Sequence, residues 1–445
     1  MTSVITSCTL NRRRMIASVA GVVASLAAPR IVRARPFEGV KIRGLSYQHR
    51  FFGILQGYIP EFERATGISV DLQLLPFPQY NQEVGRQLKM EMSSLDFINV
   101  TFFLAAQWVA AGYLCNLDRF TQDQDATPPG WNAADFVAGA QLPYRDQAGA
   151  TYGYAWEGGA MVMGLSRMDV MERRGLRMPQ TFDELAHVCA EIDAKGEIAG
   201  FVSWHLHHWC LIPYLQGMGG DVFKKPPHDV TPTLDTPEAA RALELYAKLM
   251  SCAPKEARGF TEEQARQSFI TGRANLFIHS SSWVTPALTS DESRVRATTR
   301  IARMPAGPLS DRPASNSQGL GIPSNSGNKR AAWEFVKWAL SPEMCERMVR
   351  EHGHATVCRR SVITSDTYRR KNTIAGQDLG ALYLDVLELP ARGENYMAYR
   401  TTKEFPLVGA AINRAVDAVL DRRMSAAEAL QLTQTEATTA LHQAQ

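Results

Sequence analysis

Hydrophobic and polar residues alternate with two different periods near the start of the chain. Apolar residues recur at every second position in Val40–Leu45 and again in Ile68–Leu74, which predicts two β-strands because successive strand side chains point to opposite faces. The segment between them has helical spacing, and Gly67 stands where a helix commonly ends in a left-handed residue. Pro60 interrupts this segment and predicts a kink or a helix start near Ile59. The pattern as a whole predicts a β-α-β unit.

The same alternation of strands and amphipathic helices continues along the chain. A capping box, in which a Thr or Ser and a Glu or Gln three residues later satisfy each other's backbone N–H groups, predicts a helix start at three places: Thr181 with Glu184, Thr261 with Gln264, and Ser425 with Glu428. Thr236–Pro237 opens another helix. Ala332, Phe335 and Ala339 lie on one face of a further one. Strands interleaved with such helices predict an α/β fold.

Composition and charge narrow the class of protein. The 445 residues are 45% hydrophobic and 21% charged, which is typical of a folded chain of two or three domains. The formal net charge is +3, but the first 34 residues hold five arginines and no Lys, Asp or Glu. Without them 43 basic residues face 45 acidic ones, a net charge of −2. We therefore expect no nucleic-acid partner.

The first 34 residues have the order of an export signal. Arg12–Arg14 are followed by the apolar stretch Met15–Ala28 and by small residues around Ala34. This stretch is shorter than the ~20 residues that a membrane-spanning helix needs. The paired arginines resemble the twin-arginine type of signal, while Asn11 and Met15 depart from it and leave the Sec route open. We expect a soluble periplasmic protein.

Motifs for catalysis or metal binding are absent from the sequence. It contains no phosphate-binding loop, dinucleotide motif, nucleophile elbow or H-E-x-x-H helix. His205, His207 and His208 lack a further ligand at metal-binding spacing. Glu262 and Glu263 are adjacent to each other in the sequence, so their side chains should diverge on a solvated helix face. Six cysteines follow the signal without a C-x-x-C pair. The sequence therefore predicts no enzyme activity, no metal site and no cofactor.

Several segments, taken in order, resemble the family 1 extracellular solute-binding proteins of ABC importers. Phe269–Trp283 resembles the family's F-x-x-G-(K/R)-A-x-M-x-I-x-G-x-W segment, and Ala331–Glu343 looks like its most recognisable helix. Phe62–Val70 and Gly175–Leu185 match further segments, so the resemblance covers nearly all of the chain after the signal. The Asp96 strand and Ser280–Ser282 depart from the family pattern.

The resemblance implies a two-lobed periplasmic binding protein fold, α/β, with a ligand cleft between the lobes and multiple hinge crossings. Residues 35–156 and 280–328 would form the N-lobe, and residues 157–279 and 329–445 the C-lobe. Closure on the ligand would be a hinge motion. The implied partners are a small-molecule solute, most often a carbohydrate in this family, and the permease subunits of an ABC transporter. We expect a monomer.

Candidate cleft residues come from strand ends and from the resemblance. C-terminal ends of strands in open α/β sheets form the ligand crevice, which selects Tyr47, His49, Thr101 and Phe103. The resemblance implies further substrate-binding residues in the hinge strand, the C-lobe loop and later segments: Glu157, Trp204, His207, Trp209, Asp221, Trp283, Gln318 and Arg359. Aromatic rings suit the apolar faces of a sugar.

Three functions remain open from the sequence. The first is a periplasmic protein that captures a sugar or sugar-like solute for an ABC permease. A polyol phosphate or other anionic solute is favoured if Arg359 and the histidines dominate the site. A periplasmic carbohydrate-active enzyme would need Glu157 and Asp221 as its two carboxylates.

Overall fold

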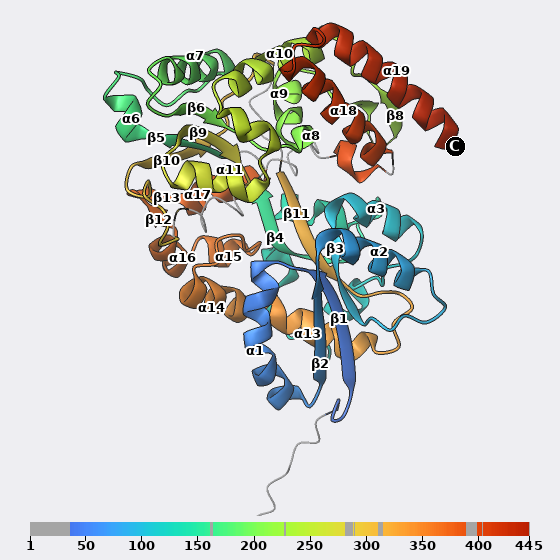
Figure 1. Cartoon of the computed structure of the whole chain (residues 1–445). Helices are drawn as coiled ribbons and strands as arrows, with labels where there is room; N and C mark the ends of the chain where they lie inside the picture. The colour runs from blue at the N-terminus through green and yellow to red at the C-terminus, as the bar shows by residue number, and fades with distance from the viewer. Residues whose placement is uncertain are drawn as a thin grey trace, which may run out of the picture.

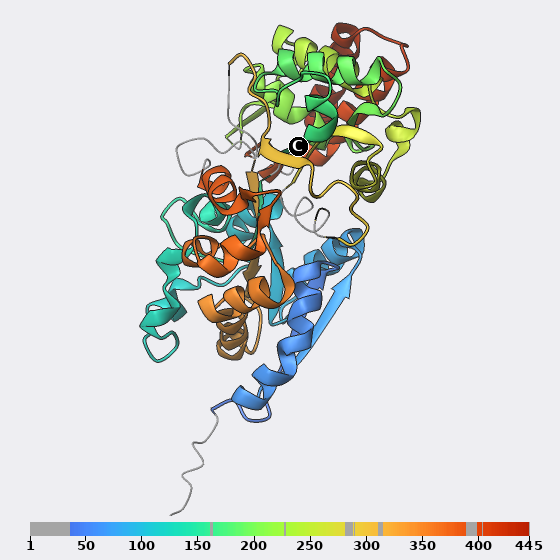
Figure 2. The ribbon, with the colours of Figure 1, turned by 90° about the vertical axis from the view of Figure 1, so that its left-hand side faces the viewer.

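The computed structural model describes residues 36–160, 163–226, 228–280, 288, 290–309, 315–388, 398–402 and 404–444. The predicted export signal and Trp283 lie outside these residues. The described chain forms two α/β lobes, one above the other in Figure 1 and still distinct in the view turned by 90° in Figure 2. No helix in the described part of the chain is long and apolar enough to cross a membrane.

The N-lobe is built on a five-stranded sheet in the order β2-β1-β3-β11-β4. β1 pairs in parallel with β2 and with β3, whereas β11 runs antiparallel to β3 and β4. Its strands are β1 (Lys41–Tyr47), β2 (Ser69–Leu75), β3 (Phe97–Thr101), β4 (Tyr154–Ala160) and β11 (Ser315–Gly321). Its helices are α1 (Arg50–Thr66), α2 (Phe77–Leu88), α3 (Phe102–Ala110), α4 (Asp118–Thr121), α5 (Ala138–Gln141), α13 (Lys329–Ala339), α14 (Pro342–His352), α15 (Arg360–Ile363), α16 (Asp366–Lys371) and α17 (Leu379–Glu388). A two-stranded ribbon, β12 (Thr373–Ile374) and β13 (Gln377–Asp378), joins α16 to α17.

The predicted β-α-β unit is confirmed, with one difference in its helix. α1 is a single helix that begins after His49 and ends at Gly67, which has the left-handed φ of 79°. Pro60 lies inside it rather than at a start. Pro60 is exposed, while Phe51, Leu55 and Phe62 keep one continuous buried face. Packing of that face against the sheet outweighs the backbone hydrogen bond that the proline removes.

The C-lobe has a smaller sheet in the order β10-β5-β9-β6. β6 is parallel to β9, and the other pairs are antiparallel. Its strands are β5 (Met163–Arg167), β6 (Ala199–Val202), β9 (Ala274–His279) and β10 (Thr299–Arg303), with a separate ribbon of β7 (Phe223–Lys225) and β8 (Asp229–Pro232). Its helices are α6 (Met168–Glu172), α7 (Phe182–Asp193), α8 (His207–Cys210), α9 (Ile212–Gly217), α10 (Pro237–Ser251), α11 (Glu262–Ile270), α18 (Phe405–Leu420) and α19 (Ala426–Ala444). The capping boxes at Thr181 and Thr261, the cap at Thr236 and the reciprocal bonds of Ser425 with Glu428 are all present.

The predicted lobe boundaries need correction. β4 stays in the N-lobe sheet to Ala160, and β10 pairs with β5 in the C-lobe sheet. α13 and α14, expected in the C-lobe, pack on the N-lobe sheet: the rings of Phe335 and Phe97 stack at 4.2 Å, and Trp333 Nε1 donates to Thr127 Oγ1 at 2.9 Å. The apolar stripe of α13 is confirmed as buried. This stripe packs on the N-lobe sheet because the sheet offers aromatic side chains such as Phe97 for Phe335 to stack on.

Candidate functional site

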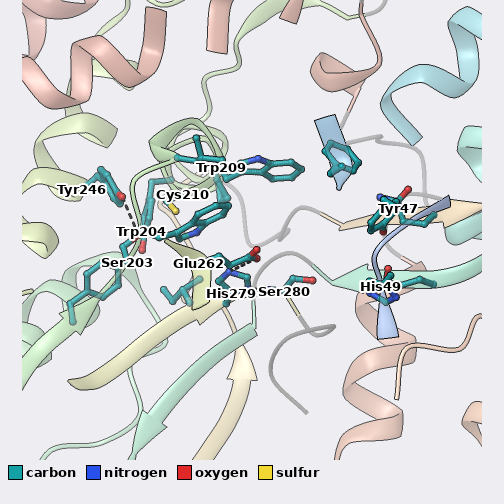
Figure 3. Close-up of a pocket in the computed structure, with 18 of the residues that line it drawn as sticks. Tyr47, His49, Ser203, Trp204, Trp209, Cys210, Tyr246, Glu262, His279 and Ser280 are labelled. Atoms are coloured by element: carbon teal, nitrogen blue, oxygen red, sulfur yellow. Dashed lines mark hydrogen bonds and ion pairs between the residues drawn. The ribbon is translucent and has the colours of Figure 1, made fainter. Parts of the chain in front are cut away.

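A cavity of about 460 Å³ lies between the two lobes. In Figure 3, Tyr47 and His49 of the N-lobe lie on one side, and Trp204, Trp209, Glu262 and His279 of the C-lobe lie on the other. The cavity is lined by Tyr47, Gln48, His49, Phe77, Glu157, Phe201, Ser203, Trp204, Leu206, Trp209, Cys210, Pro213, Tyr214, Tyr246, Glu262, Ile278, His279, Ser280 and Gln318. Six of the predicted residues are therefore brought together here: Tyr47, His49, Glu157, Trp204, Trp209 and Gln318.

On the N-lobe side, a histidine faces a buried carboxylate. Tyr47 ends β1 and His49 caps α1, where its Nδ1 accepts the Phe51 backbone N–H at 3.2 Å. Because Nδ1 is an acceptor, the hydrogen of a neutral His49 must sit on Nε2. That atom lies 3.3 Å from Oε1 of Glu157, which is 5% exposed. The cap thus orients His49 as a donor towards Glu157.

Gln318 of β11 stands opposite Glu157 of β4 in the sheet ladder. Its Oε1 is buried and has no hydrogen-bond partner within the described part of the chain. A buried amide oxygen left in this way favours a ligand that donates a hydrogen bond to it. Glu157 and Gln318 therefore present two acceptors to the cavity from adjacent strands of the N-lobe sheet.

The C-lobe side carries two tryptophans after β6. Trp204 and Trp209 are half-buried and line the cavity. The guanidinium of Arg400 lies 3.3 Å from the centre of the Trp209 ring. Arg400 is 4% exposed and donates to the Tyr399 hydroxyl at 3.1 Å and to the His208 carbonyl at 2.9 Å. Burial lowers the pKa of Arg400. This cation–π contact fixes the plane of the indole.

A second histidine–carboxylate pair lies in the C-lobe wall. His279 Nδ1 accepts the Ser280 N–H at 2.7 Å, and its Nε2 lies 3.0 Å from Glu262 Oε1. The expectation that Glu262 and Glu263 both lie on a solvated helix face is correct for Glu263 and wrong for Glu262. The two carboxylates do diverge, and Glu263 bonds Arg266 on the surface, but Glu262 turns into the cavity. His279 ends a strand, so the strand-end argument that selected Tyr47 could also have found it.

His207 does not reach the cavity, contrary to the prediction. It is fully buried, with Nδ1 3.0 Å from the Tyr246 hydroxyl and Nε2 3.4 Å from Asp417 Oδ1. Burial lowers its pKa to about 4, against the opposing effect of Asp417. The hydroxyl-bearing residues next to it, Tyr246 and Ser203, do line the cavity, and their oxygens lie 3.1 Å apart. Neither stood out in the sequence.

Arg359 is also not in the cavity. Its side chain is 0% exposed, and it donates to the carbonyls of Leu340 at 2.6 Å and Asn132 at 3.1 Å. The guanidinium packs on the rings of Trp131 and Phe136 and lies 3.3 Å from Asp135. Arg359 is a core residue of the N-lobe, because this aromatic slot and its carbonyls hold the guanidinium away from solvent.

The other predicted residues lie elsewhere. Thr101 is fully buried beside Gln318 in the ladder, and Phe103 packs against Phe77, with ring centres 6.1 Å apart. Asp221 binds the Val222 N–H at 2.7 Å behind the wall, and burial raises its pKa to about 6. No group of three metal-ligating side chains occurs within the described residues.

Comparisons with known proteins agree with this architecture. The profile of the bacterial extracellular solute-binding proteins matches residues 47–344. An erythritol/L-threitol-binding protein of Mycolicibacterium smegmatis is 21% identical over 387 residues, 83% of this chain and 80% of the relative. A ribitol complex of a solute-binding protein from Agrobacterium radiobacter superposes with a TM-score of 0.78 at 20% identity, covering 91% of this chain and 100% of that one. A D-mannitol complex from Agrobacterium vitis gives 0.77 at 21% identity, covering 91% and 99%.

Proposed function

Because this chain belongs to the family of bacterial extracellular solute-binding proteins, we propose that it binds an uncharged polyol or small sugar in the cavity between its lobes. In this proposal the protein is exported to the periplasm and delivers its solute to the permease of an ABC transporter. The observation that carries the proposal is the combination of aromatic faces and hydrogen-bond acceptors in one cavity of about 460 Å³.

The lining suits the two chemical faces of such a solute. Carbon–hydrogen faces pack on indole and phenol rings, and hydroxyls need polar partners. Trp204, Trp209 and Tyr47 supply rings, while Glu157 and Glu262 supply carboxylate oxygens. The volume lies within the range of small-molecule sites. The polyol relatives support the same class of solute.

An anionic solute is disfavoured by the charges around the cavity. Among the described residues that line it, two are glutamates and none is Lys or Arg. Arg359, the residue that would have favoured an anion, is held in the N-lobe core. A phosphate placed between two carboxylates would meet repulsion, and the histidines of the described lining, His49 and His279, each already face one of those carboxylates.

A carbohydrate-active enzyme is the second candidate, and the carboxylate pair on which the sequence based it does not form. Glu157 lines the cavity, but Asp221 is not among the lining residues and binds its neighbour's backbone. Glu262, the second carboxylate of the lining, faces His279 at 3.0 Å. We therefore infer that the protein binds its solute without converting it. Turnover of aryl glycosides that is lost in Glu157→Gln would contradict this inference.

Ligand-dependent stabilisation tests the proposed function. A solute that binds only the folded protein raises its stability by RT ln(1 + [L]/Kd). Melting of the purified mature protein should shift upwards with at least one of erythritol, L-threitol, ribitol, D-mannitol, maltose and D-tagatose. Glu262→Gln should weaken that shift, whereas Glu263→Gln on the adjacent surface position should leave it unchanged. No shift with any member of a broad panel of polyols and sugars would overturn the proposal.

A further inference from the structure

A chain of polar side chains crosses the C-lobe from its surface to the cavity. Asp417 on α18 has a side chain 52% exposed, and its Oδ1 lies 3.4 Å from Nε2 of His207. Nδ1 of His207 lies 3.0 Å from the Tyr246 hydroxyl, which lies 3.1 Å from Ser203 Oγ. Figure 3 shows the last of these contacts at the edge of the cavity. The chain therefore ends where a solute would sit.

Asp417, at the surface end of this series of contacts, determines which atom donates each hydrogen bond. Nε2 of His207 lies 3.4 Å from the Asp417 carboxylate without a hydrogen bond between them, and the negative charge of that carboxylate favours the tautomer that carries the ring hydrogen on Nε2. Burial lowers the pKa of His207 to about 4, which keeps the ring neutral at neutral pH. A neutral ring has one N–H only. Nδ1 is therefore an acceptor, and the Tyr246 hydroxyl must donate to it.

The roles of the two hydroxyls as donor or acceptor follow from that of His207. Tyr246 has a single hydrogen, and once His207 accepts it, the Tyr246 oxygen can only accept. Ser203 Oγ lies 3.1 Å from that oxygen, so Ser203 must be the donor of this pair. The thiol of Cys210 contacts both hydroxyls and keeps its proton, because burial raises its pKa to about 11. Ser203, which lines the cavity, therefore has a lone pair but no hydrogen left for a solute.

We propose that His207 is a positioning residue that acts through Tyr246 to hold Ser203 as a hydrogen-bond acceptor, so that the site selects solutes that present a hydroxyl or ammonium donor there. This inference rests on the proposed function and refines its ligand class. Three other lining groups, the carboxylates of Glu157 and Glu262 and the buried Gln318 Oε1, are also acceptors. A solute atom that can only accept meets no partner at Ser203.

The tautomer of His207 tests the inference without any solute. In ¹⁵N-labelled protein, the imidazole signals that disappear in His207→Asn should show a protonated Nε2 and an unprotonated Nδ1. The opposite tautomer would overturn the inference whether or not a polyol binds. This measurement also separates the two proposals, because failure of the whole solute panel would refute the proposed function alone.

Solute analogues test the consequence. The probe is whichever of erythritol, ribitol and D-mannitol binds most tightly, with its single-site deoxy and deoxyfluoro derivatives. Fluorine can accept a hydrogen bond but cannot donate one. At one carbon, both derivatives should therefore bind about 5- to 150-fold more weakly than the probe, as expected when a buried acceptor loses its donor. In Ser203→Ala this loss should disappear. A fluoro derivative that binds as well as the parent at every position would overturn the inference.

Asp417→Asn removes the constraint on the donor order and provides a readout that a purely structural role of His207 would not change. The side-chain amide that this substitution introduces can donate to Nε2 of His207 as well as accept from it, so the ring hydrogen is no longer confined to Nε2 and Ser203 is no longer confined to accepting. The ratio of parent to fluoro affinity at the sensitive carbon should fall about tenfold or more. Asp421→Asn is the matched control, because Asp421 at the end of the same helix pairs with Arg258 and Arg423 and has the same charge. An equal change in both variants would contradict the inference.

Discussion

Removing the indole of Trp209 should weaken solute binding and also destabilise the empty protein. One face of the ring is covered by Arg400, whose guanidinium lies 3.3 Å from the ring centre, and the ring also lines the cavity. Loss of a ring face that packs on a solute costs about 1–3 kcal/mol, or about 5- to 150-fold in Kd. Arg400 is buried, so its desolvated contact contributes about 2 kcal/mol, and the vacated volume adds to the loss. We expect Trp209→Ala to lower the free energy of unfolding by about 3–5 kcal/mol.

Denaturant unfolding without solute and calorimetric titration with the tightest-binding polyol measure the two effects separately. Trp204→Ala is the matched control, since Trp204 lines the same wall and its ring packs against His205 and His279. It should lose affinity with a smaller loss of stability. A double-mutant cycle with Arg400→Met should give a coupling of about 1–2 kcal/mol with Trp209→Ala. Unchanged affinity in folded Trp209→Ala would remove Trp209 from the site, and additive effects in the cycle would refute the cation–π contact.

Three further results are expected. The free energy of unfolding should decrease as the pH falls from about 6.5 to 4. His207, His208 and His354 have pKa values of about 4, 3 and 3, so the unfolded chain binds protons that the folded chain excludes; Asp221, with a pKa of about 6, opposes this with one group against three. A stability that rises over this range in denaturant titrations would contradict the assignment. Arg359→Leu should cost about 3–5 kcal/mol of stability, because it breaks a buried ion pair, while calorimetry of the folded fraction should find affinity within about twofold of wild type. D-Mannitol 1-phosphate should bind at least about tenfold more weakly than D-mannitol in a competition assay; tighter binding would refute the charge argument.

Elements that depend on neighbouring residues could be predicted from the sequence. The capping box at Thr261 needs only a side chain three residues away, and it forms as expected. Gly67 ends α1 in the left-handed conformation for an equally local reason. Of the two outcomes that Pro60 predicted, a kink or a start near Ile59, the start does not occur, because the buried face of the whole helix, a tertiary feature, outweighs a local rule.

Lobe membership could not be predicted in the same way. The apolar stripe of α13 indicates a buried face but not the surface that buries it. Phe335 and Trp333 pack on Phe97 and Phe120, which lie more than 200 residues earlier in the chain. Sequence order suggested a return to the C-lobe after residue 328, whereas the chain stays in the N-lobe through α17. The positions of the crossings follow from these long-range contacts.

In the candidate site, too, the residue type alone did not predict the environment of the side chain. Arg359 was assigned to the cleft because a guanidinium suits an anion, and Glu262 was assigned to solvent because it stands beside Glu263. The structure exchanges their environments: aromatic rings and carbonyls enclose the arginine, and His279 turns the glutamate inwards. Each exchange changes the charge of the cavity by one unit in the negative direction. Because Asp221 is also absent from the lining, the site holds two carboxylates, those of Glu157 and Glu262, and no Lys or Arg among its described lining residues. A neutral solute rich in hydroxyl donors is the class that such a site can hold without an uncompensated charge.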